Sequence, residues 1–296
     1  MTAGGRRAAA AALVLPLLLL AGCRFTTRKL PVPRAPLVTQ TVTPAELVSR
    51  LSQRCDALKT LNATVEIQAS VMKSKEGVAR DYTSFRGHIL MRKPEMLRVY
   101  GQIPVIGTTM FDMASDGKNF TLRVPSRNIA YQGPNTLTHK SSNAVENMRP
   151  GFFIDAMVIR CMEPDDEYMV TADTDTVEDA SKKHLLLVPE YILSVMRRKP
   201  GSQELRALRV IHFHRDDLLP YQQDVYDEQS NLETQVIYGR YADFGDNKYP
   251  SVVTIKRPLE DFQLVLTVEK VTENMQLNDD QFQIKIPEGT KIQQMQ

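Results

Sequence analysis

The residues that could perform chemistry are few: two histidines on one predicted strand, an acidic segment and three cysteines. His212 and His214 are two apart, and alternate residues of a strand share a face, so this pair could contact a metal. A third ligand is not evident, and the plainer interpretation is two exposed histidines. The acidic segment 163–183 lacks the spacing of an EF-hand calcium loop. No nucleophile elbow or Gly-rich phosphate loop occurs. We expect no enzyme, no metal and no cofactor.

Cys23 ends the pattern of an export leader. Two arginines precede an apolar run over residues 8–20, which is shorter than the roughly 20 residues of a membrane-spanning helix. The ending Leu20-Ala21-Gly22-Cys23 resembles the lipobox of bacterial lipoproteins. The resemblance implies that residues 1–22 are a signal peptide, that the Cys23 thiol is diacylated, and that the new amino group is usually acylated too.

The segment after the leader is expected to be a lipid-anchored tether. Two or more acyl chains anchor a protein stably where one gives marginal binding. Residues 23–43 contain Pro31, Pro33 and Pro36 without an apolar period, and some 20 extended residues would reach up to about 60 Å. Arg24 follows the cysteine where an Asp would signal retention in the inner membrane. The resemblance therefore implies the periplasmic face of the outer membrane.

Cys55 and Cys161 remain once Cys23 is lipidated. A location outside the cytoplasm permits a disulfide between them. Two separate buried thiols are the open alternative.

The net charge and the length are counted on the chain without its leader. The 296 residues include 37 basic and 35 acidic ones, and removal of the leader with Arg6 and Arg7 balances the charges. We therefore expect no nucleic-acid partner. The remaining 274 residues, 296 minus 22, are enough for a large β domain, and we expect one domain over 44–296.

The domain is expected to begin with a helix over 44–58. Thr43 is the predicted N-cap, Pro44 the first helical residue, and Glu46 completes a capping box. Apolar residues recur at spacings of four and three, so one face should cover another part of the protein.

Five strands in meander order are expected next. Residues 61–71 alternate apolar and polar side chains, and the same period recurs around 84–91, 97–99, 109–113 and 120–124. Asp116-Gly117 is a hairpin signal between the last two.

The remainder predicts one short helix and further strands. Residues 150–159 are expected to form an amphipathic helix, and the acidic segment a solvated loop with one strand at 168–172. Later strands are expected at 184–188, 191–197, 205–214, 221–227, 234–241, 251–256, 262–271 and 282–286. Many short strands with few helices indicate a barrel or a strongly curved sheet.

Several runs resemble the LolA/LolB lipoprotein-carrier superfamily over most of residues 44–290. They are Phe85-Arg86-Gly87-His88-Ile89-Leu90-Met91-Arg92-Lys93-Pro94 with Leu97-Arg98-Val99, Asp116-Gly117-Lys118, Asn278-Asp279-Asp280-Gln281-Phe282, and Ile286-Pro287-Glu288-Gly289. The chain is longer than a typical carrier. The resemblance implies an unclosed antiparallel β-barrel with a helical lid, whose apolar inside receives acyl chains.

The lipid-binding cavity would be lined from the helix and from the strands. For each of these side chains, plain core packing is the commoner role. The candidates are Leu47, Leu51, Leu58, Val65, Ile67, Phe85, Ile89, Leu97, Val99, Phe111, Met113, Phe120 and Leu122.

The loop 102–107 is apolar where a loop should be polar. In the anchored receptor of the resembled family, a loop at this place carries an exposed Leu that enters the membrane. Val105 or Ile106 would take that role here. A turn folded under the lid is the alternative.

Together these features predict a membrane-anchored periplasmic lipoprotein that performs no chemistry. It would bind membrane lipid or the acyl chains of lipoproteins for envelope biogenesis and outer-membrane lipoprotein localisation, with an envelope protein as a possible further partner. The alternative is a non-transporting scaffold or lipid-stress sensor with the same fold, since fold alone does not determine function.

Overall fold

A computed structural model describes residues 39–73, 78–103, 107–136, 149–178 and 185–295. It divides into a unit of Met1–Ala35 with Thr176–Leu187 and a larger unit of Pro36–Asp175 with Val188–Gln296. The described residues of the smaller unit are 176–178, at the end of strand β8, and 185–187, at the start of strand β9. The account below concerns the larger unit. The described part of the chain contains no helix with the length and apolar character to cross a membrane.

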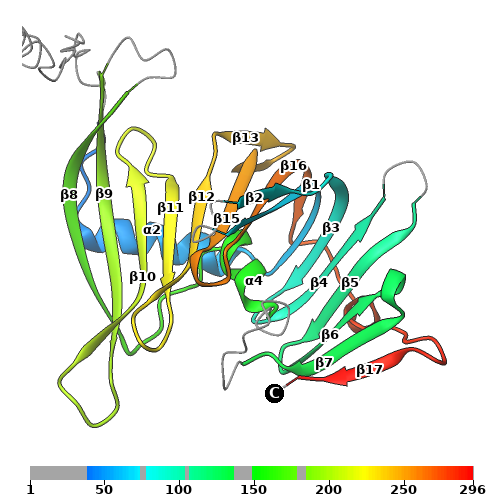
Figure 1. Cartoon of the computed structure of the whole chain (residues 1–296). Helices are drawn as coiled ribbons and strands as arrows, with labels where there is room; N and C mark the ends of the chain where they lie inside the picture. Colours follow the sequence, from blue (N-terminus) through cyan, green and yellow to red (C-terminus); the bar gives the residue numbers. More distant parts are fainter. Residues whose placement is uncertain (1–38, 74–77, 104–106, 137–148, 179–184, 296) are drawn as a thin grey trace, which may run out of the picture. The chain divides into compact units, whose positions relative to one another are not determined.

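The molecule is mainly β, with one large curved sheet that does not close into a barrel, as predicted (Figure 1). The strand order is β17-β7-β6-β5-β4-β3-β1-β16-β15-β12-β11-β10-β9-β8, with β2 paired to β1. Neighbours are antiparallel from β7 to β9, whereas β17 pairs with β7 in parallel.

The first strands form the predicted meander. Their bounds are β1 Thr60–Lys73, β2 Val78–Asp81, β3 Phe85–Arg92, β4 Met96–Gln102, β5 Thr109–Asp116, β6 Asn119–Val124 and β7 Ile129–Pro134. Alternation decides which side chains are buried: Leu61, Ala63 and Val65 of β1 are fully buried. Strands β2 and β7 are additions to the prediction.

The later strands complete the sheet, with β16 to β8 beyond β1 and β17 at the opposite edge beside β7. These strands are β8 Asp166–Glu178, β9 Leu185–Arg198, β10 Leu205–His214, β11 Pro220–Tyr226, β12 Leu232–Tyr238, β15 Val252–Arg257, β16 Phe262–Glu273 and β17 Lys291–Gln294. Between β12 and β15, β13 Tyr241–Phe244 and β14 Asn247–Pro250 form a separate two-stranded sheet.

Two sequence predictions in this group are wrong. The acidic segment is not mainly a loop, because β8 runs for 13 residues as the partner of β9. Residues 282–286 form no strand. Phe282 ends a 3₁₀ helix, Asp279–Phe282, whose capping box joins Asn278 and Gln281, and its ring is buried. The apolar Phe282 therefore suggested the start of a strand, although it is an isolated buried aromatic residue at the end of a 3₁₀ helix.

Within the described ranges, two α-helices cover parts of the sheet, α2 Pro44–Ala57 and α4 Gly151–Met157, both near their predicted bounds (Figure 1). The apolar face of α2 packs on β9 and β10 through a cluster of buried side chains. This cluster is Leu47, Leu51, Tyr191, Leu193, Val195, Ile211, Phe213 and Leu218. Helix α4 is buried on most sides and is not amphipathic. Its Phe152, Phe153 and Ile154 belong to the larger core formed by β1, β3–β6 and β15–β16.

Candidate functional site: a pocket beneath helix α2

The start of α2 is fixed by the predicted capping box. The backbone N–H of Glu46 donates to Oγ1 of Thr43 at 3.2 Å, and the backbone N–H of Thr43 donates to Oε2 of Glu46 at 2.7 Å. The hydrogen bond from the Thr43 backbone is the main reason that the pKa of the Glu46 carboxyl is lowered. Pro44 occupies the first helical position, where a missing N–H leaves no hydrogen bond unmade.

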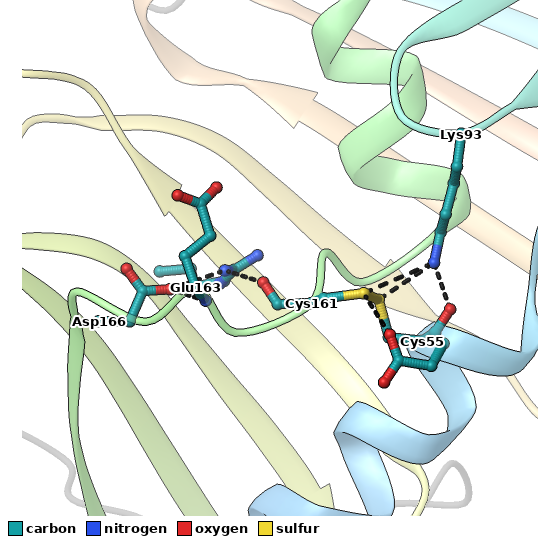
Figure 2. Close-up of a disulfide and its surroundings, with 7 residues drawn as sticks. Cys55, Lys93, Cys161, Glu163 and Asp166 are labelled. Carbon is teal, nitrogen blue, oxygen red and sulfur yellow. Dashed lines mark hydrogen bonds and ion pairs between the residues drawn. A yellow bond between two sulfur atoms is a disulfide. The ribbon is translucent and has the colours of Figure 1, made fainter.

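The end of α2 is held by a disulfide. Cys55 on the helix is bonded to Cys161 in the segment between α4 and β8, with Cα atoms 5.4 Å apart across a separation of 106 residues (Figure 2). Of the two arrangements that the sequence left open, the structure has the bonded one. The bond attaches α2 covalently to a segment distant in sequence.

Lys93 lies against this disulfide in the turn between β3 and β4 (Figure 2). Its ammonium group donates to the Cys55 carbonyl oxygen and lies 3.1 Å from Sγ of Cys55 and 3.7 Å from Sγ of Cys161. Burial, and then the charge of Lys59, lowers the pKa of Lys93. The helix end, the turn and the Cys161 segment thus meet at one point.

The Cys161 segment is fixed on its far side by arginines. Arg209 donates to the Cys161 carbonyl oxygen at 3.1 Å, and Arg197 donates to Oδ1 of Asp166 at 2.6 Å and to Oε2 of Glu163 at 3.0 Å. The Asp166 side chain is fully buried, so its charge needs these partners. The segment to which the disulfide attaches α2 is therefore itself held in place by hydrogen bonds from arginines.

Between α2 and the sheet lies a pocket of about 250 Å³. The helix supplies one wall, the end of α4 and the β10–β11 turn supply others, and three tyrosines form the rest. The lining residues are Leu47, Arg50, Leu51, Arg54, Cys55, Leu58, Met157, Val158, Ile159, Phe213, Asp217, Leu218, Leu219, Pro220, Tyr238, Tyr241, Tyr249, Pro250 and Glu273. An apolar pocket with a few polar groups is the usual form of a small-ligand site.

The three tyrosines of the pocket differ in their hydroxyl partners. Tyr241 donates to the Pro220 carbonyl oxygen at 2.9 Å, and Tyr249 donates to the Met157 carbonyl oxygen. The Tyr238 hydroxyl is buried and has no hydrogen-bond partner among the described residues. Burial raises the pKa of all three groups, so each is a neutral phenol at ordinary pH.

Charged side chains lie at the rim of this pocket. Arg50 and Arg54 are exposed residues on one side of α2, and Asp217 and Glu273 supply the opposite sign. Arg54 donates to the Lys248 carbonyl oxygen at 2.9 Å, and its guanidinium lies 5.7 Å from the centroid of the Tyr241 ring. The arrangement suits an amphipathic ligand whose apolar part enters and whose polar part stays outside.

The structure separates the predicted cavity residues into two groups. Leu47, Leu51 and Leu58 line the pocket. The strand residues lie in the large core instead, where Phe111 is only partly buried. Phe85 also lines a second pocket of about 490 Å³ beside Ile103 and Gly107. The group of strand residues is Val65, Ile67, Phe85, Ile89, Leu97, Val99, Phe111, Met113, Phe120 and Leu122. Their role in lipid binding stays a prediction.

Other predicted sites fall elsewhere. Cys23 and the loop residues Val105 and Ile106 lie outside the described residues, so lipidation and membrane insertion also stay predictions. His212 contacts Oε2 of Glu190 at 2.9 Å, and the ring of His214 stacks on Tyr221 at 4.2 Å. In the described ranges no three His, Cys, Asp or Glu residues are grouped to hold a metal ion.

Sequence reasoning missed the tyrosines. Tyr238, Tyr241 and Tyr249 follow one another at the end of β12 and through the β13–β14 hairpin, where they resemble ordinary strand residues. Their clustering over twelve residues was the available signal. Nothing in the sequence shows that one of the three hydroxyls lacks a partner.

Comparison with known proteins gives structural likeness alone. No family model and no curated protein matches the sequence. A solved DUF1329 family protein from Desulfovibrio piger has a TM-score of 0.50 and 16% identity, covering 80% of this chain and 95% of its own. A LolA superfamily protein from Nitrosomonas europaea has a TM-score of 0.51 and 12% identity, covering 82% of this chain and 99% of its own. The chain therefore has the LolA/LolB-like fold that its sequence predicted.

Proposed function

We propose that this chain is a lipid-anchored envelope protein that binds an acyl chain of a membrane lipid or of a lipoprotein beneath α2. The observation that supports this most is the pocket itself, which combines apolar walls with a charged rim. Its volume of about 250 Å³ lies just below the roughly 300 Å³ at which pockets for drug-sized ligands begin. The pocket therefore suits part of a lipid, such as one chain.

The proposed location follows from the sequence. Acylation of Cys23 would attach the chain to a membrane, and Arg24 favours the periplasmic face of the outer membrane. The tether 23–43 would leave the domain free to reach lipid or an envelope protein partner. A Cys23→Ala variant should lose incorporation of labelled palmitate; incorporation that persists would contradict the anchor.

Photo-crosslinking tests binding directly. The full chain is reconstituted in phospholipid vesicles that contain a trace of phospholipid with a diazirine near the end of one acyl chain. After illumination, digestion and mass spectrometry, we expect crosslinks on the α2 peptide that carries Leu47, Leu51 and Leu58. Crosslinks confined to exposed surface peptides would contradict the proposal.

Two tryptophan variants provide the matched control, one on α2 and one at the residue directly after its end. Leu58→Trp fills the pocket from a partly buried wall position and should remove the crosslink. Gln53→Trp adds the same ring at an exposed position that does not line the pocket and should leave the crosslink unchanged. Equal loss in both variants would indicate that the lipid contacts only the outside of the helix.

The second candidate function is a non-transporting scaffold or lipid-stress sensor. The feature that favours it is the core beneath α4, where Phe152, Phe153 and Ile154 already occupy the face of the sheet. A filled interior is what a scaffold requires. A chain that yields no pocket crosslink but copurifies with an envelope protein would support this alternative.

A further inference from the structure

The sheet carries a groove of about 280 Å³ on the face opposite the larger core. Successive residues of a strand point to opposite faces. Ala63 and Val65 of β1 and Ile89 of β3 point into the core, so the residues between and beside them point outward. Seven of the eight lining residues come in this way from the neighbouring strands β4, β3, β1 and β16. The lining residues are Asn62, Thr64, His88, Leu90, Tyr100, Lys270, Thr272 and Gln281.

The strand register places four of these side chains in one row across the sheet. Thr64 lies opposite Lys270 on one side and opposite His88 on the other, and His88 lies opposite Tyr100. Neighbouring strands are about 4.8 Å apart, so each side chain of the row lies beside the next. The rings of His88 and Tyr100 stack with their centroids 4.8 Å apart. A ligand on this row would contact all four strands.

One side of the groove is formed by the 3₁₀ helix η4, Asp279–Phe282, which lies against the same face. Arg98 donates to the carbonyl oxygen of Gln281 at 3.1 Å. The side-chain oxygen Oε1 of Gln281 accepts from the backbone N–H of Asn278 at 2.7 Å. The amide group of this side chain is thus held by its oxygen, and its nitrogen keeps two N–H groups to donate.

Lys270 gives the groove a single positive charge. It is exposed and makes no ion pair among the described residues, and no lining residue is acidic. The acidic residues beside the groove already have cationic partners. Arg98 donates to both carboxylate oxygens of Asp112 at 3.0 and 2.9 Å, and Arg86 donates to Glu269 at 2.7 Å. The charge of Lys270 is therefore available to an anion.

The other polar groups of the groove can both donate and accept hydrogen bonds. The hydroxyls of Thr64 and Thr272 have no partner within the described part of the chain. Burial, and then the charge of Arg86, lowers the pKa of His88, so its ring is neutral at ordinary pH and offers one donor and one acceptor. Sugar hydroxyls also donate and accept at the same oxygen, so these groups match them.

We propose that this groove binds a sugar that carries one carboxylate. The carboxylate pairs with Lys270, and the ring hydroxyls bond to Thr64, Thr272 and the neighbouring polar groups. The groove shares no residue with the pocket beneath α2, so the assignment is independent of the proposed function.

The charge and size of the groove favour this ligand class over simpler anions. A phosphate monoester carries close to two negative charges at neutral pH, whereas the lining provides one cation. A carboxylate group alone is a few atoms and would leave most of the 280 Å³ and the two threonine hydroxyls unused. Leu90 adds an apolar surface on which the C–H groups of a sugar ring can pack.

Lysine footprinting tests the site on the unaltered chain. The full chain in phosphatidylethanolamine vesicles is methylated with formaldehyde and a borane reductant, and each lysine is followed by digestion and mass spectrometry. Methyl glucuronide, which has no free aldehyde, should slow the methylation of Lys270. It should leave Lys118, an exposed lysine in the β5–β6 turn, unchanged.

Three other ligands decide which feature of the sugar acid is recognised. Methyl glucoside lacks the charge, acetate lacks the ring, and the 6-phosphate of methyl glucoside replaces the carboxylate. The concentration that gives half protection should be about tenfold lower for methyl glucuronide than for each of them, the worth of one charge-assisted hydrogen bond. A ligand of the three that protects Lys270 as well as methyl glucuronide would overturn the assignment, and so would the absence of protection by all four.

Two threonine variants provide a matched pair. Thr64→Val keeps the shape of the side chain and removes the hydroxyl in the middle of the row, so the half-protection concentration of methyl glucuronide should rise about fivefold. Thr254→Val makes the same change on β15, between the buried Val253 and Ile255 and outside the groove, and should leave it unchanged. The same value in both variants would overturn the role of Thr64.

Discussion

Helices α2 and α4 both cover the sheet, but they occupy the space beneath them differently. Helix α4 has seven residues, five of them buried, and its aromatic rings fill the face on which it lies. Helix α2 has 14 residues, three of them buried, and leaves a pocket of about 250 Å³. Helix α2 is also the one held by a capping box and a disulfide.

The difference separates two ways of attaching a helix to a sheet. Helix α4 is attached by its own packing, since it has no side-chain cap at its N-terminus. Helix α2 packs on β9 and β10 through Leu47 and Leu51, and it is also attached at both ends, so it stays in place beside a pocket that its packing leaves open. A pocket can therefore exist beneath a helix that is held in place by contacts other than those the pocket removes.

The largest expected effect tests whether α4 depends on packing. Phe152→Ala should lower the free energy of unfolding by about 3–5 kcal/mol, because the ring is buried against Phe262 and Arg257. Leu58→Ala, which enlarges an existing pocket, should lower it by about 1–2 kcal/mol. Urea unfolding measures both; equal losses would show that the two helices are attached alike.

Removal of the disulfide tests whether α2 depends on its ends. The double variant Cys55→Ser and Cys161→Ser should lose about 2–5 kcal/mol, because the bond closes a long loop across a separation of 106 residues. Hydrogen exchange should rise in α2 more than in α4. Dithiothreitol should shift the urea midpoint of the wild type and leave the double variant unaffected; a wild type insensitive to the reagent would contradict the anchoring role.

Substitution of a glycine by alanine should destabilise the protein more in the packed region than outside it. A Cβ on Gly101 would lie 2.6 Å from the Phe85 ring and 2.8 Å from the Phe111 ring. Gly101→Ala should therefore lower the free energy of unfolding by about 1–3 kcal/mol. Gly151→Ala, where a Cβ meets nothing within 4 Å, should be neutral or stabilising in the same thermal unfolding series. The reverse order would contradict the packing described here.

The tyrosines of the pocket permit a finer comparison. Tyr249→Phe removes a buried hydrogen bond to the Met157 carbonyl oxygen and should lower the free energy of unfolding by about 1 kcal/mol. Tyr238→Phe removes a hydroxyl without a partner and should not destabilise the protein. If chemical denaturation gave the same loss for both variants, the Tyr238 hydroxyl would have a partner after all.

The smallest expected effect concerns acid. The pKa of Glu46 is lowered in the folded protein, so its contribution is present above the ordinary carboxyl pKa and is lost as pH falls through the lowered value. Helix α4 has no acidic residue in its first turn. Amide exchange in the first turn of α2, corrected for intrinsic rates, should increase in acid while that of α4 does not. Glu46→Gln should abolish the difference.

Regular patterns predicted the elements well. Thr43, Pro44 and Glu46 located the start of α2, and alternation located β1, β3–β6 and most later strands. These signals are local, because caps and strand faces depend on residues a few positions apart. The length of β8 was missed because an acidic strand exposed on many positions lacks the apolar alternation that marks a half-buried one.

The site was predicted in part only. Leu47, Leu51 and Leu58 were identified because their helical spacing marks a covering face. The strand residues could not be divided between pocket and core, because both give the same alternation. Pocket and core residues differ in whether α2 or α4 covers them. That difference depends on tertiary structure, and so do the hydrogen-bond partners of Tyr238, Tyr241 and Tyr249.

The pairing of β1 with β16 determines when the molecule can be completed. Leu61 lies opposite Glu273, so the central strand gains its second neighbour only after more than 200 further residues have been made. A pairing between such distant strands forms slowly, because a long loop must close first, and the unpaired edge is exposed to aggregation in the meantime. If the chain is exported unfolded, the strands from residue 60 onward stay incompletely paired on the far side of the membrane until the last strands have been exported. A periplasmic chaperone that shields β1 during this interval should then raise the yield of folded protein.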